Sequence, residues 1–229
     1  MNPNPGADPH AHRYRSVLDE DTARARELIS QMGSFVETAI QCATTALLDG
    51  DRTLAGAVVT GDIALNAMQY ELRDLCFTII LTQAPVARDL REVMGIHHMA
   101  SELERMGDHC VGIGRIARDR DDRPDPERAA DITAMATLCI EQVHGMIDAL
   151  TARDVARARA IAAHDRRIDD LYNRIFHAMM TVVAVGQIDP HHATSMVFVA
   201  HHLERIGDRV TNLAEDLVYL ETGDVEELG

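Results

Sequence analysis

Pairs of acidic residues four positions apart are the feature of this sequence best suited to chemistry. Glu104 and Asp108 form one such pair, and Glu204 and Asp208 form another. At about 100° per residue, the two members of a pair lie on one face of a helix. Carboxylate oxygens are ligands for hard and borderline metal ions, and several carboxylates can bridge more than one ion. The spacing therefore raises the hypothesis of a metal site that helices must position.

A second set of polar pairs with the same spacing is expected on the neighbouring helices. Asp165 and Asp169 form the pair in the second half, and Asp62 and Asn66 form the pair in the first. Asp165 lies about 60° from Ile168, within the edge of the apolar stripe of its helix, so we expect it to be partly buried. A buried carboxylate with like-charged neighbours is unfavourable, and a bound cation would relieve that cost.

The acidic pairs belong to an internal repeat. The segment LERMGDH at 103–109 recurs as LERIGDR at 203–209, with five of seven positions identical at an offset of 100 residues. The preceding helices also align, at an offset of 103 residues, so that Asp62 corresponds to Asp165. An internal duplication is the economical explanation. Each half of the chain is then one structural unit.

Two interpretations of the repeated acids stay open on the residues alone. Arg105 and Arg205 lie beside them and could neutralise them in ordinary surface ion pairs, which would make the protein a metal-free helical adaptor. Against this, Gly107 and Gly207 each cost a helix roughly 1 kcal/mol relative to alanine. The same cost at equivalent places indicates close backbone approach, or room for something beside the acids.

Proline placement and apolar periodicity divide the chain into six expected helices. Pro85 and Pro190 each fall between two long helical patterns, and Pro124 and Pro126 lie in a charged linker. Proline inside a helix costs roughly 3 kcal/mol, so these positions mark connections. The expected helices cover residues 13–49, 52–83, 87–119, 127–151, 153–186 and 190–221.

The repeat and the six helices together predict an all-α fold of two tandem three-helix bundles. The predicted organisation is a disordered tail, a first bundle, a linker and a second bundle. These segments cover residues 1–12, 13–119, 120–126 and 127–222.

The composition supports this fold class and excludes some functions. The 229 residues are 46% hydrophobic but only 3% aromatic, so the core must be aliphatic, which suits helix-on-helix packing. The formal charge is −15, and an acidic surface repels nucleic-acid phosphates, so no nucleic acid is expected as a partner. The sequence holds no run of about 18 apolar residues, so we expect no direct membrane insertion. The four cysteines lie in helical apolar patterns and are interpreted as small buried hydrophobic residues.

The repeated segments resemble a known family. LERMGDH and LERIGDR are similar to the LERIGDH signature of PhoU-type proteins, and Asn212-Leu213-Ala214-Glu215 resembles the continuation of that signature. Residues 81–93, LTQAPVARDLREV, are similar to another segment of the family. The resemblance extends from about residue 13 to 222, in the expected order.

The resemblance implies two three-helix bundles related by pseudo-twofold symmetry, and acidic motifs that hold a multinuclear metal cluster of iron, zinc or another divalent cation. Asn66 departs from the all-acid pattern, and Arg115 lies on the face of the first-half acids, where it could replace part of the positive charge of a metal. Carried over residue by residue, the implied metal ligands are Asp62, Glu104, Asp108, Asp165, Asp169, Glu204 and Asp208.

The resemblance also implies a function. PhoU-type proteins are negative regulators of the phosphate-starvation response and phosphate uptake, and link a phosphate ABC transporter to a sensor histidine kinase. No enzymatic activity is expected. The implied state is a homodimer in the cytoplasm, held at the inner face of the membrane only through its partners.

A carboxylate-bridged, di-iron-like enzyme on a helical bundle is the alternative from another class. Such sites usually need two Glu-x-x-His motifs on facing helices, and this sequence has only Glu141 with His144. The adjacent histidines at 97–98, 191–192 and 201–202 are also tempting ligands. Neighbouring residues point about 100° apart on a helix, so such a pair cannot face one ion from one side.

Overall fold

The computed structural model describes residues 9–120 and 124–229, with side chains from Arg15 onward in that range. It is built of helices, and no strand occurs in these residues. The helices are α1 (Pro9–Asp49), α2 (Arg52–Gln83), α3 (Ala87–Asp119), α4 (Pro126–Ala152), α5 (Val155–Ala162), α6 (Arg166–Ala184) and α7 (Pro190–Thr222).

Aspartate side chains begin four of these helices. Asp51 accepts hydrogen bonds from the backbone N–H groups of Thr53 and Leu54, and Asp125, Asp154 and Asp189 cap α4, α5 and α7 in the same way. Such caps satisfy backbone donors that have no partner within the helix. The expected helix starts at 52, 127 and 190 agree with these caps to within one residue.

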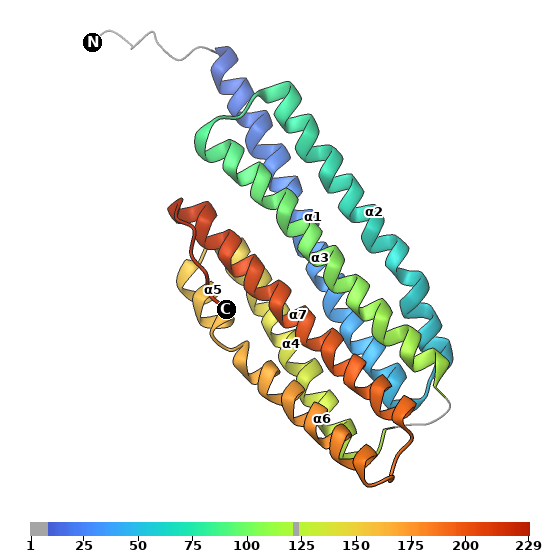
Figure 1. Cartoon of the computed structure of the whole chain (residues 1–229). Helices are drawn as coiled ribbons and strands as arrows, with labels where there is room; N and C mark the ends of the chain where they lie inside the picture. The colour runs from blue at the N-terminus through green and yellow to red at the C-terminus, as the bar shows by residue number, and fades with distance from the viewer. Residues whose placement is uncertain (1–8, 121–123) are drawn as a thin grey trace, which may run out of the picture.

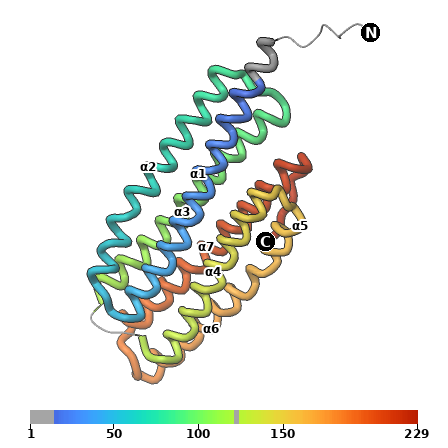
Figure 2. The backbone as a smooth tube through the Cα atoms, turned by 180° about the vertical axis from the view of Figure 1, so that it is seen from behind, coloured from blue at the N-terminus to red at the C-terminus, as the bar shows by residue number. Residues whose placement is uncertain are grey.

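The helices form two bundles that share one core. Helices α1, α2 and α3 pack on one another, and α4 packs with α5, α6 and α7. The halves meet where α3 lies along α7 and α1 lies along α4. Figures 1 and 2 show the two bundles side by side, with the first extending further at the end where α1 begins. The expected pair of three-helix bundles is confirmed.

The prediction of one continuous fifth helix over residues 153–186 is wrong. It is divided into α5 and α6 by a turn at residues 163–165. In this turn the backbone N–H groups of His164 and Asp165 donate to carbonyls three residues back, at 3.0 and 3.1 Å. The tighter spacing interrupts the α-helical ladder and places Asp165 at the start of α6.

Two other expected segments touch residues outside the described ones. Of the expected tail at 1–12, residues 1–8 lie outside the described residues, and α1 begins at Pro9 rather than at 13. Of the expected linker at 120–126, residues 121–123 are likewise not described, and α4 begins at Pro126.

The core is aliphatic, as the composition predicts. Met32, Leu65, Leu103 and Met135 are among its fully buried side chains. Of the four free cysteines, Cys76, Cys110 and Cys139 are buried and Cys42 is partly buried. Burial raises the pKa of the Cys76 thiol to about 11, so it stays protonated and unreactive. Within the described part of the chain, no helix is both long and apolar enough to span a lipid bilayer.

Candidate functional site

The second-half site lies where α6 meets α7. A Cβ atom added at Gly207 would lie 2.5 Å from Oδ1 of Asp165, closer than real Cβ contacts come. The backbone of α7 therefore approaches the Asp165 carboxylate so closely that a larger residue at this position would have to displace that side chain. The sequence prediction of close approach beside the acids is confirmed at Gly207.

Asp165 is the most perturbed carboxyl group of this site. Its Oδ1 is buried and has no hydrogen-bond partner. Burial, followed by the charges of Asp169, Asp208 and Glu204, raises the pKa of Asp165 to about 6. The four second-half acids are therefore close enough to repel one another, as the spacing predicted.

The other acids of this site meet basic groups only in part. Burial and the charge of Asp208 raise the pKa of Glu204, although His201 Nδ1 lies 3.2 Å from Glu204 Oε2. Burial and Asp208 also raise the pKa of Asp169. Arg205 Nη1 lies 2.5 Å from Asp208 Oδ2. One of the four carboxylates thus forms the arginine pair that the metal-free alternative expects.

The first-half site has the equivalent position on α2 and α3, but the repulsion between its carboxylates is weaker. Asn66 Nδ2 donates to Asp62 Oδ2 at 2.8 Å. Burial, then Asp108, raises the pKa of Asp62, while Asn66 and Arg115 act in the opposite direction. Burial, then Asp108 and Asp62, raises the pKa of Glu104. The amide of Asn66 and the guanidinium of Arg115 therefore lessen the repulsion that the second half retains.

Arg105 and Glu215, two charged residues close to the repeated acids in the sequence, have partners outside the acid sites. Arg105 Nη1 lies 2.7 Å from Glu102 Oε1, and among the described residues it forms no ion pair with Glu104 or Asp108. Glu215 Oε1 accepts a hydrogen bond from the backbone N–H of Leu228 at 3.0 Å, so it holds the C-terminal segment.

The donor chemistry of the acids suits a divalent cation, although their geometry is not that of a closed metal site. Asp62 and Asp165 each keep one buried carboxylate oxygen without a hydrogen-bond donor, which a cation would satisfy. In the part of the chain that is described, no three His, Cys, Asp or Glu side chains are arranged to hold one ion. The seven ligands named from the resemblance therefore stay a prediction.

The histidines do not act as adjacent pairs. His201 faces Glu204, whereas Nδ1 of His202 lies 3.2 Å from Nδ1 of His109 on α3. His98 contacts Asp216 at 2.6 Å, and His97 contacts the ring of Phe77. Members of a pair thus turn to different partners, as the helical angle predicts.

The single Glu-x-x-His motif lies apart from the repeated acids. His144 Nδ1 lies 3.3 Å from Oε1 of Glu37 on α1, and its Nε2 lies 3.9 Å from Asp148. Nothing in these contacts favours the di-iron enzyme.

Glu102 is a buried charged residue to which the sequence analysis assigned no role. It is 1% exposed and lies between α3 and α7. Its carboxylate accepts from Arg105 at 2.7 Å, Arg209 Nη1 at 3.2 Å and Asn212 Nδ2 at 2.7 Å. The only sequence feature that could have drawn attention to Glu102 is its position directly before the repeated segment. Its burial could not be predicted, because it depends on the docking of the two halves.

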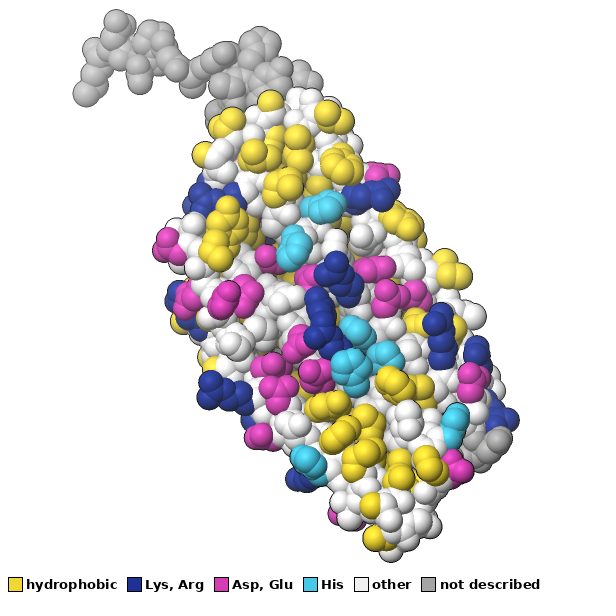
Figure 3. Space-filling view, in the orientation of Figure 1, with side chains coloured by type: hydrophobic (Ala, Val, Ile, Leu, Met, Phe, Trp, Pro, Cys, Tyr) yellow, Lys and Arg dark blue, Asp and Glu magenta, His cyan; other side chains and the backbone are white. Residues whose placement is uncertain are grey.

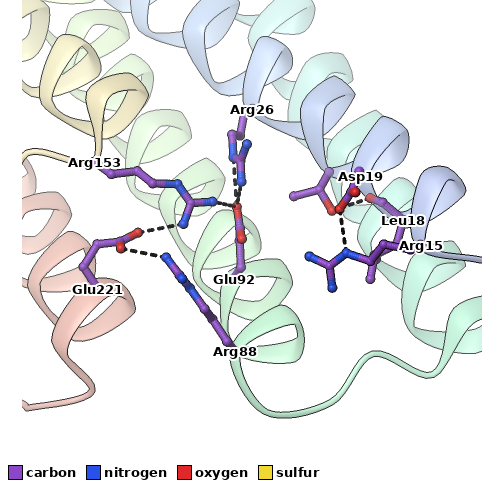
Figure 4. A network of polar contacts seen from close by, with 9 residues as sticks. Arg15, Leu18, Asp19, Arg26, Arg88, Glu92, Arg153 and Glu221 are labelled. Carbon is purple, nitrogen blue, oxygen red and sulfur yellow. Dashed lines mark hydrogen bonds and ion pairs between the residues drawn. The ribbon is translucent and has the colours of Figure 1, made fainter. Parts of the chain in front are cut away.

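A second unpredicted network joins the halves near the end of α7 (Figure 4). Arg153 lies 2.7 Å from Glu92 of α3 and 2.9 Å from Glu221 of α7. Arg26 also pairs with Glu92, and Arg88 pairs with Glu221 at 3.0 Å. Arg153 holds this place from a left-handed backbone conformation, with φ of 55°. Because each guanidinium already faces a carboxylate, we interpret the network as a cross-link rather than an anion site.

Comparison with known proteins agrees with this architecture. The PhoU domain model matches residues 29–117 and 132–217, one match in each half. The chain is 31% identical over 207 residues to the phosphate-specific transport system accessory protein PhoU homolog of Zymomonas mobilis, covering 90% of this chain and 87% of that protein. It is 31% identical over 198 residues to the phosphate-specific transport system accessory protein PhoU of Escherichia coli K12, covering 86% and 82%.

Solved structures show the same fold. The crystal structure of the phosphate transport system regulatory protein PhoU from Streptococcus pneumoniae superposes with a TM-score of 0.85 at 27% identity, covering 92% of this chain and 100% of that one. PhoU from Pseudomonas aeruginosa gives a TM-score of 0.85 at 26% identity, covering 90% and 99%. With a domain match in each half and relatives that align over nine-tenths of its length, the chain belongs to the PhoU family.

Proposed function

We propose that this chain is an accessory and regulatory protein of a phosphate transport system. The observation that carries the proposal is the double PhoU domain match, together with 31% identity over 90% of the chain to a protein named as such an accessory protein. The solved structure that covers 92% of the chain is named as a phosphate transport regulator. These relatives are named for accessory and regulatory roles, which supports a function without catalysis.

In the finer form of the proposal, the protein represses the phosphate-starvation response while phosphate is plentiful. It does so by linking a phosphate ABC transporter to a sensor histidine kinase in the cytoplasm, as a homodimer. The absence of a membrane-spanning helix among the described residues is compatible with attachment through partners alone. An acidic, all-helical surface is suited to docking on protein domains.

Gene deletion tests the regulatory role. We expect the deletion to switch on phosphate-starvation genes in phosphate-rich medium, and complementation to restore repression. Normal repression in the deletion strain, with no second copy of the gene, would contradict the role.

Affinity purification tests the link itself. The full-length protein, tagged and isolated from phosphate-replete cells, should carry the cytoplasmic subunit of the transporter and the kinase with it. Recovery of neither partner after mild crosslinking would contradict the link. Analytical ultracentrifugation of the same preparation tests the homodimer.

We also propose that the acids of each half hold a divalent metal cluster. The support is the pair of buried, undonated oxygens of Asp62 and Asp165 and the mutual repulsion among neighbouring carboxylates. A bound cation would neutralise that repulsion and satisfy those oxygens. Protein purified without added metal, and without an affinity tag, should contain a bound divalent ion by elemental analysis.

A further inference from the structure

The acids of the second half are one end of a longer surface strip. On α6, Asp165, Asp169, Tyr172, Phe176 and Met180 recur at spacings of three and four, so they share one helix face. The matching face of α7 holds Asp208, Glu204 and His201, and exposed Phe198 lies at its edge, about 60° round the helix from His201. We call these two faces together the α6–α7 strip. Its residues are Asp165, Asp169, Tyr172, Phe176, Met180, Phe198, His201, Glu204 and Asp208.

Contacts connect the acidic end of the strip to its apolar end. His201 Nδ1 lies 3.2 Å from Glu204, and the His201 ring centroid lies 6.2 Å from that of Tyr172. The Tyr172 ring in turn lies 6.4 Å from that of Phe176. Figure 3 shows the same order over α6 and α7, with acidic, histidine and hydrophobic side chains following one another along the surface.

The apolar end of the strip is open to solvent. Phe198 is 53% exposed, Met180 42% and Phe176 36%. A single exposed apolar residue is ordinary in a protein, but a group of large ones bounded by polar residues marks an interaction site. Aromatic residues and methionine are also the side chains enriched at protein interfaces.

In the metal-free protein, the acidic end carries negative charge that its neighbours do not balance. Among the described residues, only His201 and Arg205 pair with the four carboxylates, and neither Asp165 nor Asp169 forms an ion pair. The whole chain has a formal charge of −15. A ligand that covers the strip must therefore be apolar at one end and positively charged at the other.

The first half has a similar polarity. On α2 and α3, Asp62, Glu104 and Asp108 lie at one end, and exposed Phe77 and Met94 lie further along. His97 contacts Phe77, with ring centroids 5.9 Å apart. These residues do not correspond to those of the second half, however, because the positions equivalent to Tyr172, Phe176 and His201 are Gln69, Arg73 and Ser101. The full combination of acids, histidine and large apolar side chains on one surface therefore belongs to the second half.

We propose that the α6–α7 strip docks an amphipathic helix of a partner protein, with lysine or arginine residues at one end and large apolar residues along the rest. Apolar side chains of the helix pack on Phe176, Met180 and Phe198, and its basic end faces the carboxylates of the metal-free protein, where it takes the place of a bound cation. The inference rests on the proposed function, because it names the surface through which a regulator of this family would hold a partner. A second copy of this chain is disfavoured as the occupant by its own negative charge.

A designed peptide tests the proposal with the full-length protein. The probe is a fluorescent helix of about 18 residues, roughly five turns, with four lysines at one end and leucines on one face of the remainder. A control peptide has the same composition, with the lysines spread evenly along it. Fluorescence anisotropy in buffer with chelator measures both affinities. We expect the ordered peptide to bind about tenfold more tightly than the control peptide, a difference typical of one good interface anchor.

Two matched variants locate the binding. Phe176→Ser with Phe198→Ser should weaken binding of the ordered peptide about tenfold or more. Ile63→Ser with Tyr70→Ser removes two exposed apolar residues of α2 outside the strip and should leave the affinity unchanged. Asp169→Asn should reduce the salt dependence of binding. Circular dichroism confirms that each variant is folded.

Equal affinity for both peptides, or equal loss in both double variants, would overturn the proposal. Self-association of the protein that competes with the peptide and is lost in Phe176→Ser with Phe198→Ser would instead identify a second copy as the occupant. If the peptide binds the strip but cells yield no transporter or kinase, the proposed function fails and the docking surface stands. If those partners still co-purify with the Phe176→Ser, Phe198→Ser protein, the strip is not their docking surface.

Discussion

The interface between α3 and α7 contains two contacts that the internal repeat makes equivalent, and they are built from different chemistry. In the first, Glu102 is buried and accepts from Arg209 and Asn212. In the second, the equivalent residue is His202, which meets His109 with Nδ1 atoms 3.2 Å apart. One ring nitrogen must donate and the other accept, so the two rings cannot both be imidazolium ions. The duplicated helices have the same packing, while one of the equivalent contacts is ionic and the other is neutral.

The two acid sites differ in the same manner. Asp62 and Asp165 each keep one buried, undonated oxygen, but Asp62 also accepts a hydrogen bond from Asn66, whereas Asp165 has three acidic neighbours. Asn66 thus partly satisfies the first site from within the protein, and the proposed cation would do so at the second. The same arrangement of helices therefore holds two acid sites that differ in how far neighbouring groups offset the repulsion between carboxylates.

The largest expected effect is at the ionic contact of the interface. Glu102→Ala leaves Arg209 poorly solvated and without its carboxylate, which should lower the free energy of unfolding by about 3–5 kcal/mol. His202→Ala at the equivalent position breaks a neutral contact and should cost about 1–2 kcal/mol. Urea denaturation followed by circular dichroism measures both. If the histidine variant proves the more damaging, the contrast between the two contacts is wrong.

A smaller effect of opposite sign is expected when Asp165 is replaced. In chelator at pH 7, Asp165→Asn removes the repulsion and supplies an amide donor, so it should raise the free energy of unfolding by about 1–2 kcal/mol. Asp62→Asn should gain less, because Asn66 already donates to Asp62. Equal gains at both positions would show that the two sites are not different.

The pH dependence of that gain follows from the raised pKa of Asp165. Burial and its acidic neighbours raise the pKa from 3.8 to about 6, so the folded state binds more protons than the unfolded state between these values. The contribution of Asp165 to stability is complete below pH 3.8 and is lost as the pH rises through 6. The advantage of Asp165→Asn should therefore be largest at pH 7 and shrink on acidification. A gain that grows on acidification contradicts this assignment.

The smallest expected effect concerns the glycine beside Asp165. Gly207→Ala brings a methyl group against the Asp165 carboxylate and should cost about 1 kcal/mol net of the helix propensity gained. In a protein that already carries Asp165→Ala, the same substitution should cost less or stabilise. The double-mutant cycle measures this coupling by urea denaturation. Additive effects would mean that the close contact with Asp165 is not the reason that a glycine is needed at position 207.

The helices and the paired acids were predictable because they depend on local patterns. Apolar periodicity, prolines and aspartate caps place α2, α3 and α7 to within a residue or two, and the repeat pairs Asp165 with the acids of α7. The turn at 163–165 was not predictable, since the flanking residues keep a helical pattern across it. The burial of Glu102 was equally hidden, because a glutamate beside Leu103 becomes interior only when α3 docks on α7. Contacts between halves depend on packing that no short segment encodes.

Metal stoichiometry most directly tests the central proposal, namely that the second-half carboxylates bind a divalent cation. Untagged protein is equilibrated with a divalent ion, dialysed and assayed by elemental analysis, alongside Glu204→Ala with Asp208→Ala and the equivalent Glu104→Ala with Asp108→Ala. We predict that the second-half variant loses the metal of the second half at nearly unchanged helix content, while the first-half variant retains that metal. Unchanged stoichiometry in the second-half variant would contradict the account.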